Sequence, residues 1–180
     1  MQIQSGKFRG KKITLPPKNI TRPTSQRASE ALFSSLESNY KHFDLFVDAF
    51  AGSGAIGITA LSKNLADFVI FTESDPQVFK ILKSNSASLK DTKNYKIADS
   101  DFFKYIKTVK NLKNAVIFMD PPFEDTLTAV RKLKQLLPIL DKSTLIVIES
   151  ELPEIQLPEG LELIKSKKYG RINFFFIKNT

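Results

Sequence analysis

The chain has 180 residues, of which 42% are hydrophobic, so it suits one globular domain with a sizeable core or a domain with a small appendage. It contains no cysteine, which excludes disulfide bonds and thiolate metal sites. No apolar run is long enough to span a bilayer and the N-terminus lacks a signal-peptide pattern, so we expect a cytoplasmic protein without membrane or metal partners.

The positive charge is concentrated at the N-terminus. The net charge is +8, and residues 1–27 hold seven basic residues and no acidic one, which leaves 20 basic and 19 acidic residues for the rest. On charge alone, a polyanion-binding surface and a solvated terminal segment explain this asymmetry equally well. The basic residues of the segment are Lys7, Arg9, Lys11, Lys12, Lys18, Arg22 and Arg27.

Two elements are predicted before the main body. Residues 3–16 place two glycines between short extended pieces, which is typical of a small hairpin or arm. In residues 22–36 the apolar side chains recur at helical spacing, so we expect a helix that packs on the main body. Either Thr24 or Ser25 is suited to cap the N-terminus of this helix.

From Leu45 onward, predicted strands and helices alternate. The predicted strands are short apolar runs: 45–50, 68–74, 95–98, 115–119 and 144–150. The predicted helices are 55–64, 76–89, 101–110 and 126–137. Asp75 caps the second of these with Pro76 in its first turn, and Pro138 is expected to end the last. Residues 161–170 and 171–178 predict a terminal hairpin pair.

This alternation predicts an α/β fold of the Rossmann-like kind. We expect a mostly parallel seven-stranded sheet with helices on both faces and a C-terminal antiparallel hairpin. Residues 1–40 would form the small basic hairpin and packing helix, and residues 41–180 a single compact domain. A ligand site is then expected beyond the C-terminal ends of the strands. Four short polar stretches would meet there, namely residues 48–54, 73–75, 99–101 and 120–123.

The segment DAFAGSGAIG contains a glycine loop. Gly52, Gly54 and Gly57 match the dinucleotide-binding fingerprint, in which glycines let the backbone approach a ligand and turn from strand into helix. Glu73, near the end of the next strand, could accept two hydrogen bonds from ribose hydroxyls. Nicotinamide enzymes and methyltransferases that use S-adenosylmethionine both need these features, and a simple tight turn is the third possibility.

Asp48 favours the methyltransferase over the dehydrogenase. A carboxylate just before the glycine loop would repel a pyrophosphate, whereas it would attract the cationic amino and sulfonium groups of S-adenosylmethionine. The sequence also offers no proton relay to a substrate carbonyl, which a dehydrogenase would need.

The stretch VIFMDPPF, residues 116–123, predicts a site for an amine. Prolines fix the backbone after a buried strand, so Asp120 and the carbonyl of Pro121 would be held side by side as hydrogen-bond acceptors. Together they could orient the exocyclic amine of a nucleobase, while Phe123 stacks on the base. The alternative is a structural turn in which Asp120 caps the helix that begins near Thr126.

The order DAFAGSGAIG, Glu73 and DPPF resembles the class I methyltransferases that act on nucleobase amines with S-adenosylmethionine. The upstream RPTSQRASEALFSSL, the basic GKFRGKKI and the later IVIESE narrow the resemblance to one family. This family is the bacterial 16S ribosomal RNA guanine-N2 methyltransferases of the RsmD type. The resemblance covers nearly the whole chain and is weakest after Glu151.

The resemblance implies a role for particular residues. The residues implied to line the methionine end of the cofactor are Asp48, Phe50, Gly52, Ser53 and Gly54. Those implied for the ribose and adenine are Glu73, Ser74, Asp101 and Phe102, with Asp99 as a competitor of Asp101. Those implied to hold the guanine are Asp120, Pro121, Pro122 and Phe123. Ser74 departs from the family, where a bulkier apolar residue beside the adenine is usual. The implied RNA contacts are Lys7, Arg9, Lys11, Lys12, Arg22 and Arg27, although the two last arginines could also meet the cofactor carboxylate.

The implied reaction is methylation of a guanine N2 amine, with S-adenosyl-L-homocysteine as the second product. The implied partner is 16S ribosomal RNA or the assembling 30S subunit, and we expect a monomer. The nearest alternative is an adenine-N6 methyltransferase of DNA or RNA. Alternatives of another class are a non-catalytic RNA-binding protein and an NAD(P)-dependent oxidoreductase.

Overall fold

A seven-stranded mixed sheet forms the centre of the computed structural model, which describes residues 1–17, 24–87, 89 and 93–180. The strand order is β3-β2-β1-β4-β5-β7-β6. Neighbours from β3 to β5 are parallel, and β7 pairs antiparallel with both β5 and β6. The strands are β1 Phe43–Asp48, β2 Ala66–Glu73, β3 Tyr95–Asp99, β4 Ala115–Met119, β5 Leu145–Ser150, β6 Leu161–Tyr169 and β7 Ile172–Asn179. The predicted fold class is therefore confirmed.

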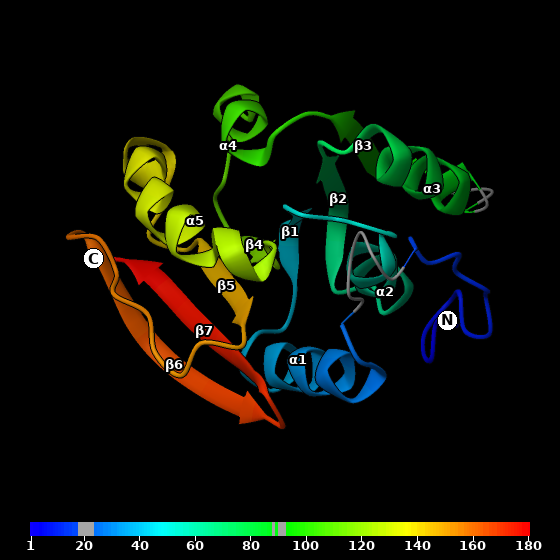
Figure 1. Cartoon of the computed structure of the whole chain (residues 1–180), viewed down its shortest axis with the longest axis horizontal. Coiled ribbons are helices and arrows are strands. Elements are labelled where there is room, and N and C mark those ends of the chain that lie inside the picture. The colour runs from blue at the N-terminus through cyan, green and yellow to red at the C-terminus, as the bar shows by residue number, and fades with distance from the viewer. Residues whose placement is uncertain (18–23, 88, 90–92) are drawn as a thin grey trace.

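Helices cover both faces of the sheet (Figure 1). One apolar cluster joins the sheet to α1, α2 and α3, and a second joins the opposite face to α4 and α5. The α-helices are α1 Gln26–Asn39, α2 Ala55–Ser62, α3 Pro76–Ala87, α4 Phe102–Tyr105 and α5 Thr126–Lys132. The 3-10 helices are η1 Ile106–Thr108, η2 Phe123–Asp125 and η3 Leu133–Ile139.

The central strands are apolar because both of their faces are covered. All five residues of β4 and all six of β5 are buried, including Glu149 and Ser150 at the end of β5. Strands buried on both faces are expected to be nearly continuous apolar runs rather than alternating ones. This makes the few polar groups at their C-terminal ends conspicuous, since they interrupt an otherwise apolar layer.

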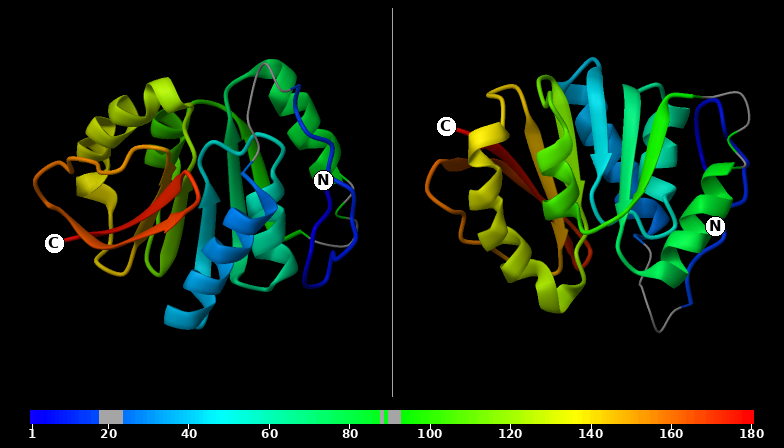
Figure 2. Two further views of the ribbon diagram at one scale, coloured as in Figure 1. Left: turned by 60° about the horizontal axis from the view of Figure 1, so that its bottom comes forward. Right: turned by 90° about the horizontal axis from the view of Figure 1, so that it is seen from above.

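The N-terminal arm packs on the same core as α1 and α2. Residues Gln2 and Lys12 form an isolated antiparallel bridge, and the side chains of Ile3 and Ile13 are buried. The arm is also bonded to the end of α2, where the backbone N–H of Lys7 donates to the carbonyl of Ser62 at 2.7 Å. Figure 2 shows that the arm and the C-terminal β6–β7 hairpin lie at opposite ends of the molecule.

Two predicted helices are shorter than expected. The helix predicted at 101–110 is α-helical only over Phe102–Tyr105 and continues as the 3-10 helix η1. β-Branched residues at 106, 108 and 109 disfavour the α-helix here. The helix predicted at 126–137 changes from α5 to η3 after Lys132, and η3 runs through Pro138 instead of ending before it. A proline ring clashes with the carbonyl four residues earlier in an α-helix, and the chain has changed to the 3-10 form before reaching that point.

The hydrogen bonds show which residues cap the helices α1 and α3. Asp75 Oδ1 accepts the backbone N–H groups of Gln77 and Val78, which confirms it as the cap of α3. Ser25, and not Thr24, caps α1, because Ser25 Oγ accepts the N–H of Ala28. In the described part of the chain, no helix has the length and apolar character that crossing a membrane would require.

Candidate active site

Acidic side chains gather at the C-terminal edge of the parallel strands. Asp48 ends β1, Glu73 ends β2, Asp120 directly follows β4, and Glu149 lies one residue before the end of β5. These strands are parallel neighbours in the register that pairs Asp48 with Phe71 and Phe118. Because parallel strands end at the same edge of the sheet, the four carboxylates lie around one site, where ligands bind in open α/β sheets.

The glycine loop has a left-handed backbone at Gly52 and Gly54. Gly52 has φ +54° and nothing within 4 Å of the place where a side chain would begin, so the loop is open at this point. Gly54 has φ +79° and is the N-cap of α2. At Gly57, a Cβ atom would lie 2.2 Å from the ring of Phe71, so close packing of α2 on β2 requires glycine.

Asp48 is tied to the helix that follows the loop. Its carboxylate accepts the backbone N–H of Gly57 at 2.9 Å, and the residue is only 2% exposed. Burial raises the pKa of Asp48 to about 7, the bond from Gly57 opposes the rise, and the nearby charges of Asp120 and Glu73 add to it. A cation placed beside this group would stabilise its ionised form.

Glu73 is fixed by backbone donors on both oxygens. Oε2 accepts the N–H of Gly52 at 3.0 Å and Oε1 accepts the N–H of Asp75 at 2.9 Å. Each carboxylate oxygen has a further lone pair, and the side chain is partly exposed at the sheet edge. Glu73 is therefore held in one orientation beside the glycine loop and can still accept bonds from a ligand. Ser74, next to it, is exposed.

The residues expected near the adenine lie around the end of β3. Asp99 pairs with Glu73 in the sheet register and is exposed, whereas Asp101 accepts the N–H of Lys104 and caps α4. Phe102 is 2% exposed and packs edge-on against Phe103, with ring centroids 4.9 Å apart. The ring centroid of Phe102 also lies 6.2 Å from that of Phe50, which is partly exposed. The assignment of Asp99 or Asp101 to the adenine stays a prediction.

Asp120, in the turn after β4, does not cap the helix α5 that follows. Asp120 Oδ2 accepts a hydrogen bond from Thr24 Oγ1 at 3.3 Å, and a 3-10 turn at Phe123–Asp125 precedes α5. The capping alternative is therefore wrong. Pro121 is buried, whereas Pro122 is exposed and the ring of Phe123 is 62% exposed, which is unusual for so large an apolar side chain. The turn thus presents an aromatic ring to solvent beside a carboxylate whose pKa is raised, mainly by burial.

Two residues of this site were missed by reasoning from the sequence. The sequence indicates Thr24 only as a possible cap and Glu149 only as part of the segment IVIESE. Thr24 Oγ1 lies 3.1 Å from Glu149 Oε2 as well as 3.3 Å from Asp120 Oδ2. A glutamate inside a run of buried strand residues was the signal that could have identified Glu149, since buried acids need a partner.

The basic residues of the arm are mostly at the surface. Lys7, Arg9 and Lys12 are exposed, and Lys11 is partly exposed. Arg27 is exposed in the first turn of α1, whereas Arg22 lies outside the described residues. Lys7 and Lys11 both lie over the ring of Phe8, with Nζ 5.6 Å from its centroid.

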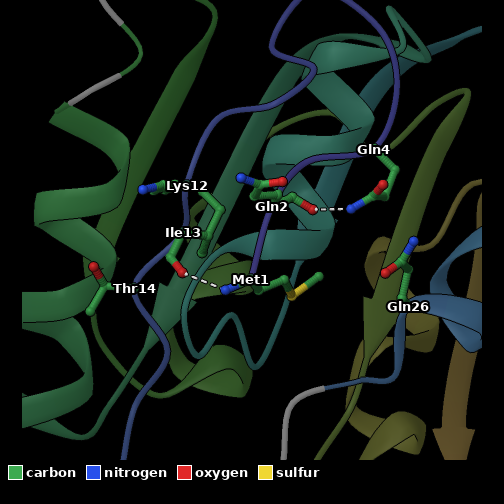
Figure 3. Close-up of a pocket in the computed structure, with 7 residues that line it drawn as sticks. All are labelled: Met1, Gln2, Gln4, Lys12, Ile13, Thr14 and Gln26. Carbon is green, nitrogen blue, oxygen red and sulfur yellow. Dashed lines mark hydrogen bonds between the residues drawn. The ribbon is translucent and has the colours of Figure 1, made fainter.

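An open hollow of about 570 Å³ lies between the arm and the start of α1 (Figure 3). Its lining is polar over most of its extent and includes one lysine and three glutamines. The lining residues are Met1, Gln2, Gln4, Lys12, Ile13, Thr14 and Gln26. Across residues 1–17, 24–87, 89 and 93–180, no group of three or more histidine, aspartate or glutamate side chains is arranged to hold a metal ion.

The family described as "Conserved hypothetical protein 95" matches residues 1–178. The chain belongs to this family. A relative from Haemophilus influenzae named "Ribosomal RNA small subunit methyltransferase D" is 31% identical, over 99% of this chain and 94% of its own. The resemblance to the RsmD-type enzymes is thereby confirmed.

Solved structures agree with the fold. A structure from Escherichia coli (yhhF) has a TM-score of 0.80 at 28% identity and covers 99% of this chain and 97% of its own. The rRNA methyltransferase aviRa from Streptomyces viridochromogenes has a TM-score of 0.69 at 12% identity, covering 88% of this chain and 86% of its own. The latter likeness shows the class I methyltransferase fold alone.

Proposed function

We propose that this protein is an S-adenosylmethionine-dependent methyltransferase that methylates the exocyclic N2 amine of a guanine in 16S ribosomal RNA. The observation that carries the proposal is the arrangement of Asp120 and the exposed ring of Phe123 at the same sheet edge as the glycine loop. The printed name of the Haemophilus influenzae relative supports the RNA substrate class. The choice of guanine N2 rests on the family resemblance.

The residues at the glycine loop fit the cofactor. Gly52 leaves open space where a side chain would begin, and Glu73 keeps accepting capacity at the position expected for a ribose. Asp48 adds negative charge for the cationic end of S-adenosylmethionine. Asp48, Phe50, Gly52, Ser53 and Gly54 would hold the methionine end. Glu73, Ser74, Asp101 and Phe102 would hold the ribose and adenine. The bound cofactor supplies an electrophilic methyl group.

The DPPF turn would orient the amine. An exocyclic amine is a poor nucleophile because its lone pair is delocalised into the ring, so the site must fix its two N–H groups. Asp120 Oδ1 and the carbonyl of Pro121 would accept these hydrogens, and Phe123 would stack on the base. Catalysis would then come mainly from positioning and from preorganised hydrogen-bond acceptors.

The arm and α1 would bind the RNA backbone. Lys7, Arg9, Lys11, Lys12 and Arg27 supply positive charge, and the hollow at Lys12 and Gln26 leads from the arm to the start of α1. Thr24, two residues before Gln26, contacts Asp120, so this surface adjoins the proposed catalytic turn. We therefore propose that residues 1–40 bind RNA and that residues 41–180 carry the methyltransferase chemistry, in a cytoplasmic monomer.

Methyl transfer to bacterial ribosomal RNA tests this function. The protein is incubated with labelled S-adenosylmethionine and either 16S RNA or 30S particles from cells that lack this activity. The RNA is then digested to nucleosides and analysed by mass spectrometry. We expect N2-methylguanosine at one position. Label in N6-methyladenosine would instead support the adenine alternative, and no label in either substrate would contradict the function.

A further inference from the structure

Thr24 bridges two carboxylates that the sequence keeps far apart. Its Oγ1 lies 3.1 Å from Glu149 Oε2 and 3.3 Å from Asp120 Oδ2. Glu149 is 3% exposed and pairs with Phe174 of β7, so apolar strands surround its stem. Glu149 is therefore a buried acid that is linked through the Thr24 hydroxyl to the catalytic turn, and the proposed reaction gives it no role so far.

The bridging hydroxyl has only one hydrogen. Thr24 can therefore donate to one of the two carboxylates, and its oxygen can serve the other group only as an acceptor. Both distances are within hydrogen-bond range, and both bonds are satisfied together if one of the carboxyl groups is protonated and donates to Thr24. Two carboxylates that share one hydroxyl, one of them buried and the other partly buried, also resist simultaneous ionisation.

Electrostatics place the shared proton on Glu149. Burial is the largest cause that raises the pKa of Glu149, to about 9, and the negative charge of Asp120 adds to it. The pKa of Asp120 is also raised mainly by burial, but only to about 7. The negative charges of Asp120 and of Glu73 on β2 also raise the pKa of Asp48 on β1. Within the described ranges, the ion pairs involve other acids, namely Asp67, Glu37 and Glu151, so no lysine or arginine there is paired with this group of carboxylates.

We propose that Glu149 is a positioning residue for the catalytic turn, held as a neutral acid that donates to Thr24, which in turn donates to Asp120 Oδ2. Asp120 is then fixed as an ionised acceptor whose Oδ1 is free for the nucleobase amine. This inference rests on the proposed function, because it assigns a role within the same reaction.

Glu149 and Asp120 differ in how they handle protons during the reaction. Methylation of the amine forms a C–N bond and breaks a C–S bond, whose electron pair stays on sulfur, and one N–H bond of the amine is broken. Asp120 accepts that proton and passes it to water. Glu149 keeps its own proton throughout, so it acts only through Thr24 and does not touch the reacting atoms.

Four variants test this chain of hydrogen bonds in single-turnover methyl transfer to 30S particles. Glu149→Gln imitates the neutral acid and keeps a donor for Thr24, so its rate at pH 7.5 should stay within about threefold of wild type. Glu149→Ala and Thr24→Val each break the chain and should lose on the order of a hundredfold, as for other preorganised groups. Thr24→Ser keeps the hydroxyl and should restore most of the rate. Glu162→Gln, at an exposed position of β6, is the matched control.

The pH profile gives a readout that a purely structural role would not move. In wild type the rate should fall at low pH as Asp120 gains a proton and again at high pH as Glu149 loses one. Glu149→Gln should keep the acid fall and lose the alkaline one. If Glu149→Gln is as slow as Glu149→Ala, the residue works as an anion and the inference is wrong. A wild-type rate for Glu149→Ala would also overturn it.

A titration without substrate separates this inference from the proposed function. Carbon NMR of labelled glutamate side chains should show Glu149 titrating well above its ordinary pKa. If wild type methylates no RNA yet Glu149 titrates high, the proposed function fails and the shared proton stands. If Glu149 titrates near its ordinary pKa in an active enzyme, the function stands and this inference fails.

Discussion

The carboxylate of Glu73 accepts the backbone N–H of Gly52 at 3.0 Å, although the two residues lie 21 positions apart in the sequence. This bond joins the acid proposed to bind the ribose to the loop proposed to hold the methionine end of the cofactor. The two halves of the cofactor site are therefore fixed to each other before any ligand binds, which reduces the ordering that binding would require.

Replacement of Glu73 should weaken the cofactor site as a whole. Glu73→Ala removes both the ribose acceptor and the partner of Gly52, so the affinity for S-adenosylhomocysteine should fall by about 10- to 100-fold, as loss of hydrogen bonds to a charged group predicts. Isothermal titration calorimetry measures the affinity, with Asp67→Ala on the same strand as a control. Unchanged binding by Glu73→Ala would contradict the ribose assignment.

Asn85 should couple the arm to the glycine loop. Its side chain accepts the N–H of Thr14 and donates to the carbonyls of Thr14 and Ser53, and it is 5% exposed. Asn85→Ala would leave three backbone groups without these partners, among them the carbonyl of the buried Ser53, so we expect a loss of about 1–3 kcal/mol in the free energy of unfolding. Affinity for S-adenosylhomocysteine should fall as well, because Ser53 lies in the loop.

Urea unfolding and calorimetry check both effects of Asn85→Ala, with the exposed Asn94→Ala as the control. A variant that is destabilised but binds S-adenosylhomocysteine as well as wild type would show that the arm and the loop are not coupled.

The buried carboxyl group of Asp48 should make stability depend on pH. Its pKa is raised from 3.8 to about 7 in the folded state, so between these values the folded protein holds a proton that the unfolded chain has released. The free energy of unfolding of wild type should therefore decrease as pH rises through this window. Asp48→Asn cannot titrate but keeps an acceptor for Gly57, so its stability relative to wild type should increase from pH 4 to pH 7 and then level off.

Urea unfolding of both proteins at four or five pH values, without ligand, tests this prediction. A stability difference between Asp48→Asn and wild type that does not change with pH would show that Asp48 titrates at its ordinary value. A difference that changes in the opposite direction would show that its pKa is lowered.

The basic arm should bind RNA through phosphates. Lys12→Gln, at the edge of the hollow, should weaken RNA binding similarly for different sequences and reduce the slope of log K against log salt by about 0.9, the value for one released counterion. Fluorescence anisotropy across a salt series measures the slope. Lys134→Gln, exposed in η3 and distant from the arm, should leave it unchanged. An unaltered slope for Lys12→Gln would remove this residue from the interface.

Local rules predicted much of this fold. The strand at 115–119 was predicted with the bounds that the structure shows, because five buried apolar residues end at an acid and two prolines. The capping by Asp75 followed from its place before a proline. Helices 101–110 and 126–137 were predicted too long, because periodicity does not distinguish an α-helix from the 3-10 turns that continue it.

The site was only partly accessible to such rules. The glycine loop and the DPPF turn are each local motifs, so their residues could be named from the sequence. The bond from Thr24 to Glu149 joins positions 125 residues apart, and only the folded sheet brings them together. A threonine before a helix is an ordinary N-cap candidate, so the sequence gives no sign that Thr24 instead bonds to a residue on a distant strand.

Single-turnover methyl transfer by Asp120→Ala to 30S particles tests the central claim most directly, with the affinity for S-adenosylhomocysteine measured in parallel. If Asp120 orients the amine, the rate should fall by on the order of a hundredfold or more, while cofactor affinity stays near that of wild type, since the proposed ribose and methionine contacts lie on other loops. Asp120→Asn should retain part of the rate, because its amide oxygen still accepts a hydrogen bond. A rate for Asp120→Ala close to that of wild type would contradict the account and leave the DPPF turn without a catalytic role.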